Sequence, residues 1–175
     1  MLGLGNGLIK GGGANVLSLT DTYTSDFTSN TDGWAAYSST DLTLSNNQTI
    51  DSSSGWLKGT YGATQTNVSG ITKSLGWATS AGDMIIWSYK IHIVNDGGKW
   101  DPEGDSDGVM QYTTFGVNNS LITTTLDSTT TNSSTAYLAS GMGDQTMIIK
   151  FQTADDLPQE DAVFYVKDFS LEWWS

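Results

Sequence analysis

The chain has 175 residues, enough for one domain that buries roughly 70% of the surface its unfolded form would expose. Nineteen acidic residues face seven basic ones, all of them lysine, and the formal net charge is −12. Nucleic acids and anionic membranes are bound through Lys and Arg, so this charge excludes both as partners. Cysteine is absent, which removes disulfides and thiol chemistry.

The composition predicts an all-β protein. Charged residues make up only 15% of the chain, while aromatic residues reach 11%. Ser, Thr, Asn and Gly dominate the rest, which suits strands with polar outer faces and many turns. The aromatic content is too high for a disordered polar chain.

The first segment, "MLGLGNGLIKGGG", mixes glycine with aliphatic residues and predicts a docking arm over residues 1–14. It does not read as a signal peptide, because its lysine follows the apolar residues. Burying its aliphatic side chains does not offset the entropy lost on ordering the segment alone, so we expect it to need a second surface. The expected partner-docking residues are Leu2, Leu4, Leu8 and Ile9, with a hinge at Gly11, Gly12 and Gly13.

Residues 15–175 are expected to form one β-sandwich domain. The strongest strand is 84–94, where Ile85, Trp87, Tyr89, Ile91 and Ile93 alternate with polar residues. A similar alternation runs through 146–153. Further strands are expected at 15–20, 41–45, 56–61, 68–75, 109–117, 121–126, 135–138 and 162–173. Roughly ten short strands without a sustained helical period predict a jelly roll of two antiparallel sheets.

The final strand changes phase. Phe164 and Val166 share one face, whereas Phe169, Leu171 and Trp173 share the other. A bulge near Lys167 and Asp168 would keep both groups inside the domain.

The stretch "DPEGDSDG" is the best candidate for a metal site. Asp101, Glu103, Asp105 and Asp107 stand at alternate positions, and their oxygens could wrap a calcium ion. The EF-hand pattern is incomplete, so a solvated acidic hairpin loop is the alternative. No other cofactor is expected.

Catalytic signatures are missing from the sequence. There is no G-x-S-x-G or H-E-x-x-H motif, and the single histidine, His92, is expected on the exposed face of its strand. A pair of glycosidase carboxylates remains an alternative, because a sequence does not show the distance between acidic side chains. We expect a protein that is not an enzyme.

Aromatic residues near strand ends suggest a sugar site. Trp56, Tyr61, Trp77 and Trp100 could stack on pyranose rings, with core or rim packing as the alternative.

Three stretches carry a resemblance: "TSDFTSNTDGWAAYSS", "GDMIIWSYKIHIVN" and "DAVFYVKDFSLEW". Together they resemble the carbohydrate-binding-module-like jelly rolls over residues 24–174. Lys167 stands where that family often has an Asp, which weakens any carry-over of a structural cation site.

The leader "LGLGNGLIKGG" is similar to leaders of tailed-bacteriophage virion proteins. The combined resemblance implies a virion structural protein, such as a capsid-decorating, cement or tail-associated protein. Its partners would be other virion proteins, in a homo-oligomer or a lattice, and it would lie on the virion exterior after a soluble stage in the host cytoplasm. The alternative function is a module that binds host-surface glycans.

Overall fold

The computed structural model describes residues 16–39, 41–95, 97–100, 109–115, 118–153 and 156–175. For Tyr112 and residues 118–122 only the backbone is described. The predicted docking arm, with Leu2, Leu4, Leu8, Ile9 and Gly11–Gly13, lies outside the described residues. So does the predicted calcium loop with Asp101, Glu103, Asp105 and Asp107.

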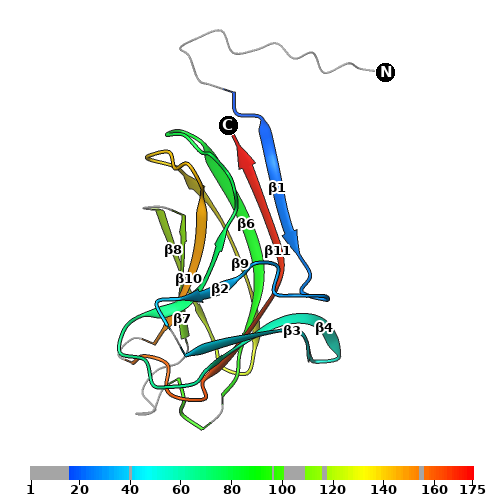
Figure 1. Cartoon of the computed structure of the whole chain (residues 1–175), viewed down its shortest axis with the longest axis vertical. Helices are drawn as coiled ribbons and strands as arrows, with labels where there is room; N and C mark the ends of the chain where they lie inside the picture. Colours follow the sequence, from blue (N-terminus) through cyan, green and yellow to red (C-terminus); the bar gives the residue numbers. More distant parts are fainter. Residues whose placement is uncertain (1–15, 40, 96, 101–108, 116–117, 154–155) are drawn as a thin grey trace.

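Two antiparallel sheets pack face to face, as the sequence predicts, and form a jelly-roll β-sandwich (Figure 1). The larger sheet has the order β3 (Leu42–Ile50), β4 (Ser53–Tyr61), β11 (Val163–Trp174), β6 (Met84–Ile93) and β9 (Thr129–Tyr137), and β1 (Leu19–Ser25) also pairs with β11. The smaller sheet has the order β2 (Ala35–Tyr37), β5 (Ser69–Ser74), β10 (Thr146–Gln152), β7 (Val109–Phe115) and β8 (Asn118–Thr124). The described part of the chain contains no helix that could cross a membrane.

The alternating residues of β6 and β10 build the core. Ile85, Tyr89, Ile91 and Ile93 of β6 are fully buried, and Met147, Ile149 and Phe151 of β10 face them from the other sheet. Aromatic pairs join the layers, such as Phe151 and Phe164 with ring centroids 4.3 Å apart. The period-2 prediction is therefore confirmed in both strands.

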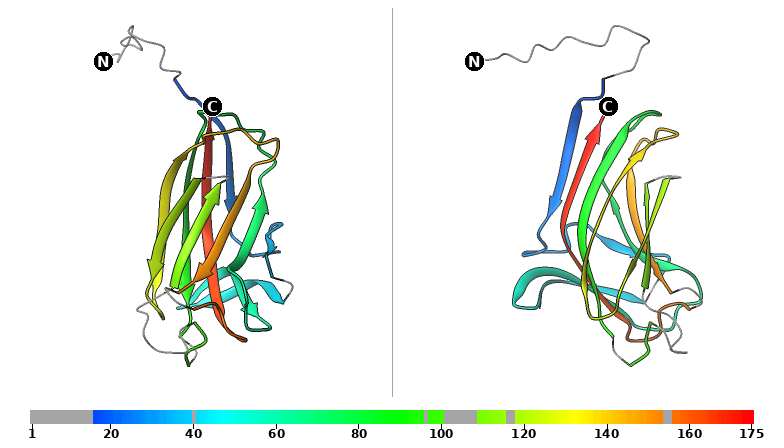
Figure 2. Two further views of the ribbon diagram at one scale, coloured as in Figure 1. Left: turned by 90° about the vertical axis from the view of Figure 1, so that its left-hand side faces the viewer. Right: turned by 180° about the vertical axis from the view of Figure 1, so that it is seen from behind.

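The predicted irregularity in β11 is also confirmed. Pairing with β6 shifts register between Lys167 and Ser170, and Asp168 has a φ of 52°. The same edge of β11 pairs with β4 through residues 163–166 and with β1 through residues 169–174 (Figure 2). The bulge therefore marks the point where one strand exchanges one neighbour for another.

A buried polar cluster connects the two sheets. Asn132 Nδ2 donates to Tyr89 Oη at 2.7 Å and to Thr113 Oγ1 at 3.1 Å. Tyr89 Oη and Thr113 Oγ1 lie 2.7 Å apart. Tyr89 and Asn132 belong to the larger sheet and Thr113 to the smaller one, so this cluster fixes how the sheets face each other.

Candidate functional site

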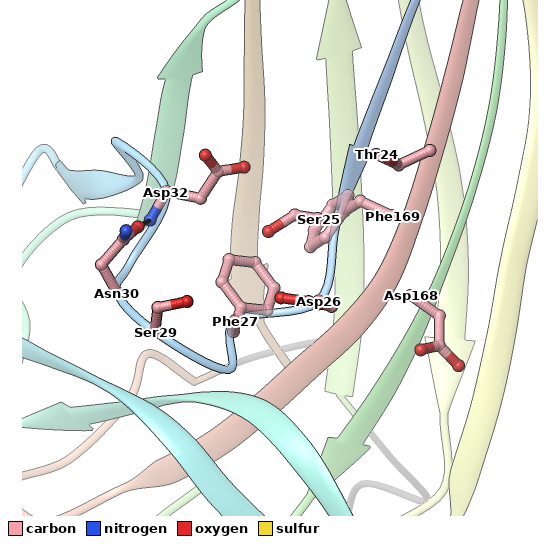
Figure 3. Close-up of a pocket in the computed structure, with 9 residues that line it drawn as sticks. All are labelled: Thr24, Ser25, Asp26, Phe27, Ser29, Asn30, Asp32, Asp168 and Phe169. Atoms are coloured by element: carbon pink, nitrogen blue, oxygen red, sulfur yellow. Dashed lines mark hydrogen bonds between the residues drawn. The ribbon is translucent and has the colours of Figure 1, made fainter.

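A pocket of about 520 Å³ opens where β1 ends and β11 bulges (Figure 3). The loop after β1 supplies most of its wall, and β11 supplies the rest. Its lining consists of carboxylates, hydroxyls, one amide and two phenyl rings: Thr24, Ser25, Asp26, Phe27, Ser29, Asn30, Asp32, Asp168 and Phe169.

Short-range hydrogen bonds shape the loop. Asp26 Oδ1 accepts from the Thr28 backbone N–H and from the Thr28 hydroxyl, both at 3.0 Å. These two bonds lower the pKa of the exposed Asp26 carboxyl, the backbone bond most. Asn30 Oδ1 in turn accepts from the Asp32 backbone N–H at 2.5 Å. The polar side chains of this wall are therefore held by their own backbone.

Close backbone approach fixes the base of the loop. Gly55 has a φ of 79°, and a Cβ atom there would lie 2.5 Å from the carbonyl oxygen of Asp26. Asn47 N–H donates to the carbonyl of Phe27 at 2.8 Å. The β3–β4 hairpin thus packs against the base of the loop, and only glycine fits at position 55.

Asp32 is anchored to the domain by aromatic side chains. Tyr23 Oη donates to Asp32 Oδ2 at 2.5 Å, and Trp34 Nε1 donates to Tyr23 Oη at 3.0 Å. Burial, followed by the bond to Asp32, raises the pKa of Tyr23 well above its ordinary value. Lys73 Nζ donates to the Asp32 backbone carbonyl at 2.7 Å. This carboxylate has a defined position before any ligand arrives.

Asp168 lies between two ammonium groups. Lys90 Nζ is 2.8 Å from its Oδ2, and Lys167 Nζ is 3.7 Å from its Oδ1. Lys167 Nζ also donates to Ser53 Oγ at 2.7 Å and to the Ser54 carbonyl at 3.2 Å. The Lys167 ammonium therefore places a positive charge among these oxygen atoms. It lies near the position where the family resemblance would suggest a structural metal cation. Among the described residues, no three acidic or histidine side chains gather closely enough to hold a metal ion.

The two phenyl rings lie beneath the pocket and do not form a stacking platform. Phe27 is 1% exposed and Phe169 is 2% exposed. They meet edge to face at 5.8 Å, and Trp34 packs on Phe169 at 4.6 Å. A ligand in this pocket would meet oxygen and amide groups.

The four aromatic residues predicted as sugar contacts lie in the interior. Trp56, Tyr61, Trp77 and Trp100 are 3%, 0%, 3% and 1% exposed. Trp77 Nε1 donates to Asp21 and Trp100 Nε1 to the Val163 carbonyl, so these two indole groups are hydrogen-bonded within the domain. Their ring faces cannot receive a sugar, and we do not include them in the site.

The expectation for His92 is wrong. Its side chain is buried, with Nδ1 3.2 Å from Thr129 Oγ1 and its ring edge-on to Tyr165. The next strand, β9, and the Tyr165 side chain cover a position that alternation alone assigns to solvent.

The pocket was not predicted from the sequence. Its signal is the run "SDFTSNTDG", in which Asp, Asn and Ser cluster around turn positions. Phe27 and Asp32 have φ values of 49° and 51° there, which indicate a loop with a defined backbone conformation. Only the pairing of β1 with β11 brings Asp168 to the same place.

The outer face of the smaller sheet is a second exposed surface. Lys150 Nζ lies over the Tyr37 ring, 5.4 Å from its centroid. One face of this tyrosine ring is therefore already covered by a lysine side chain.

Solved structures with the same fold include carbohydrate-binding modules. A family 22 module from Paenibacillus barcinonensis, a xylan-binding domain, is 12% identical, with 92% of this chain and 97% of that chain covered and a TM-score of 0.56. The C-terminal family 22 module of a Clostridium thermocellum protein is 11% identical, with 86% and 92% covered and a TM-score of 0.54. An arabinose-bound α-L-arabinofuranosidase is 13% identical over 81% of this chain but only 23% of that enzyme, with a TM-score of 0.54.

No family model matches the chain, and no curated protein matches it in sequence. The fold is a jelly-roll β-sandwich, which this chain shares with the carbohydrate-binding modules named above. At these identities the similarity establishes the fold, and the function has to be argued from the site.

Proposed function

We propose that this chain is a carbohydrate-binding module that holds a neutral glycan in the pocket between β1 and β11. The observation that supports the proposal is that oxygen and amide groups with fixed positions surround one open pocket. Carboxylates accept hydrogen bonds from sugar hydroxyls, and such charge-assisted bonds are roughly twice as strong as neutral ones. The xylan-binding neighbour supports the same class of ligand.

The charges of the pocket select against anionic ligands. Three of its lining residues are aspartates, and the whole chain carries a net charge of −12. Phosphate, sulfate and uronic acids would meet like charge, which costs binding free energy. We therefore infer a preference for uncharged polysaccharides.

The same geometry favours binding over hydrolysis. A glycosidase needs a carboxylic acid whose pKa is raised so that it can protonate the leaving group. Of the three pocket aspartates, Asp26 has a lowered pKa, which does not suit an acid that must protonate a leaving group. We propose binding without turnover.

The test is affinity electrophoresis in gels that contain neutral xylan, with calorimetry on xylohexaose. A double substitution, Asp26→Asn with Asp168→Asn, keeps an oxygen for Thr28 and a side chain of equal size, yet removes both charges. We expect it to lose at least about tenfold in affinity, near 1.4 kcal/mol. Asp144→Asn is the matched control, because Asp144 also accepts from a backbone N–H and a hydroxyl but lies outside the pocket. Unchanged binding by the double variant would place any glycan elsewhere.

The virion interpretation stays a prediction that rests on residues 1–14. The solved structures named above include carbohydrate-binding modules and no virion protein, so we propose the glycan-binding alternative instead. The virion interpretation predicts that removing residues 1–14 abolishes incorporation into a particle while the β-domain still folds. Full occupancy of the truncated protein in such a particle would contradict it.

A further inference from the structure

An apolar row crosses the outer face of the larger sheet, at the end where the described chain begins and ends (Figure 1). Leu19 pairs with Trp174, Trp174 with Met84, and Met84 with Tyr137. Directly paired residues of antiparallel strands share a face, so the four side chains form one line over β1, β11, β6 and β9. Their chain neighbours Ile85, Ala136 and Trp173 contribute to the interior, which places the row outside.

The row is open to solvent at both of its ends. Tyr137 is 67% exposed and Leu19 is 49% exposed, while Val16 just before β1 is 94% exposed. Ile86 follows on the same face between Glu172 and Thr135, and the Glu172 carboxylate accepts a hydrogen bond from Trp174 Nε1 at 3.0 Å. The face then continues with Ser88, Ser133 and Ser170 around a shallow hollow. A contiguous apolar patch bounded by polar residues is typical of an interaction site.

The sequence of residues 2–8 has a matching pattern. It reads L-G-L-G-N-G-L, so Leu2, Leu4 and Leu8 fall at even positions and every odd position is glycine. In an extended chain, even positions share one face. That face would be mainly aliphatic, and the opposite face would carry no side chains at all.

The connection between this segment and the row is short. Ser18 and Ser175 exchange two backbone hydrogen bonds, of 3.0 and 3.1 Å, beside the Leu19–Trp174 pair. The residues that precede Val16 therefore start at the same end of the sheet as the row. An extended chain advances about 3.3 Å per residue, and the row crosses only three strand spacings of about 4.8 Å each. Gly11–Gly13 permit the chain reversal that this path requires.

We propose that residues 2–8 dock in extended form on the row of Leu19, Trp174, Met84 and Tyr137 of the same molecule. The leucine face covers the apolar row, and the glycine face remains outward. The row is the second surface that the segment needs in order to become ordered. This surface is separate from the glycan pocket, and the proposal does not depend on glycan binding.

The test uses the full chain labelled with ¹³C at the methionine methyl groups, in the presence of a soluble gadolinium chelate. Relaxation of the Met84 methyl by the chelate is expected to rise severalfold when residues 1–14 are deleted. The buried Met147 methyl and the exposed Met142 methyl serve as internal references and are expected to stay unchanged. Equal relaxation of Met84 in both proteins would overturn the proposal.

Two single substitutions separate docking from general hydrophobicity. Leu8→Ser places a hydroxyl on the docking face and is expected to raise Met84 relaxation. Ile9→Ser removes a similar apolar side chain at an odd position and is expected to leave Met84 as in the intact chain. Equal effects of the two substitutions would exclude the extended register proposed here.

Light scattering on the same samples decides which molecule supplies the segment. A monomer with a protected Met84 supports docking within one chain, whereas a dimer that dissociates on truncation overturns it in favour of exchange between copies. Protection of Met84 that appears only on adding xylan would also overturn it, because the row would then be a glycan platform.

Discussion

The ammonium group of Lys167 is surrounded by oxygen atoms and an aromatic ring. It donates to Ser53 Oγ and the Ser54 carbonyl, and it lies 5.3 Å from the Trp56 ring centroid. The Lys167 side chain is only 12% exposed, whereas the Lys90 and Asp168 side chains are 45% and 47% exposed. The two lysines on either side of Asp168 are therefore expected to contribute very differently.

We predict that Lys167→Met lowers the free energy of unfolding by about 1 to 3 kcal/mol, because two hydrogen bonds and a cation–π contact are lost. Lys90→Met is the matched control, since an exposed ion pair contributes only about 0 to 1 kcal/mol. Urea unfolding followed by tryptophan fluorescence measures both. A loss for Lys90→Met as large as that for Lys167→Met would contradict this assignment.

Residue roles were the hardest feature to predict from the sequence. Trp100 lies near a predicted strand end and was a candidate for stacking on a sugar, with core packing as the alternative, and Val163 and Phe151 come from distant segments to bury it. Asp26 and Asp168 are separated along the chain and meet only because β1 pairs with β11. A sequence shows local alternation, but it does not show which distant strand covers a given side chain.

At the scale of elements, the bulge in β11 decides which side chains reach the core. Phe164 and Val166 precede it, Phe169 and Leu171 follow it, and all four are buried. In a regular strand of the same sequence, the second pair would turn to solvent, and the one extra residue at the bulge keeps it inside. Asp168 has a φ of 52°, a conformation that glycine adopts without a steric cost.

Deletion of Asp168 is therefore predicted to leave the domain folded, because Lys167 would then precede Phe169 directly and regular alternation would keep all four side chains on the inner face. Asp168→Gly keeps the bulge and removes the contacts of Asp168 with Lys90 and Lys167, so its unfolding free energy should stay within about 1 kcal/mol of the original. Circular dichroism and heteronuclear NMR spectra show whether both variants fold. An unfolded deletion variant would contradict this prediction and show that β11 needs the extra residue where it changes partner from β4 to β1.

Strands with strong apolar alternation were predictable, and weakly patterned strands were not. The sequence predicted β6, β10 and the phase change of β11, because in each of them large apolar residues contrast with polar ones. It missed β2, which has only three residues, and it misplaced the ends of β8 and β9. Those two strands are rich in Thr, Ser and Asn, so their inward and outward positions look alike in the sequence.

At the scale of the whole molecule, buried tyrosines join the layers of the sandwich. Tyr89 meets Thr113 of the opposite sheet, and its complete burial raises its pKa to about 12. Burial likewise raises the pKa values of Tyr23 and Tyr61 well above the ordinary range. The folded protein therefore keeps phenolic protons that the unfolded chain releases near pH 10.

This difference determines whether the free energy of unfolding rises or falls at alkaline pH. A raised pKa in the folded state gives a contribution that is complete below about pH 10 and is lost as the pH approaches about 12. For Tyr89 the shift corresponds to about 3 kcal/mol. Tyr89→Phe should therefore flatten the fall in unfolding free energy between these pH values, although it costs about 1 kcal/mol at neutral pH because Asn132 loses an acceptor. Guanidinium titrations at several alkaline pH values measure the slopes, and identical slopes for Tyr89→Phe and the original chain would show that Tyr89 does not couple stability to pH.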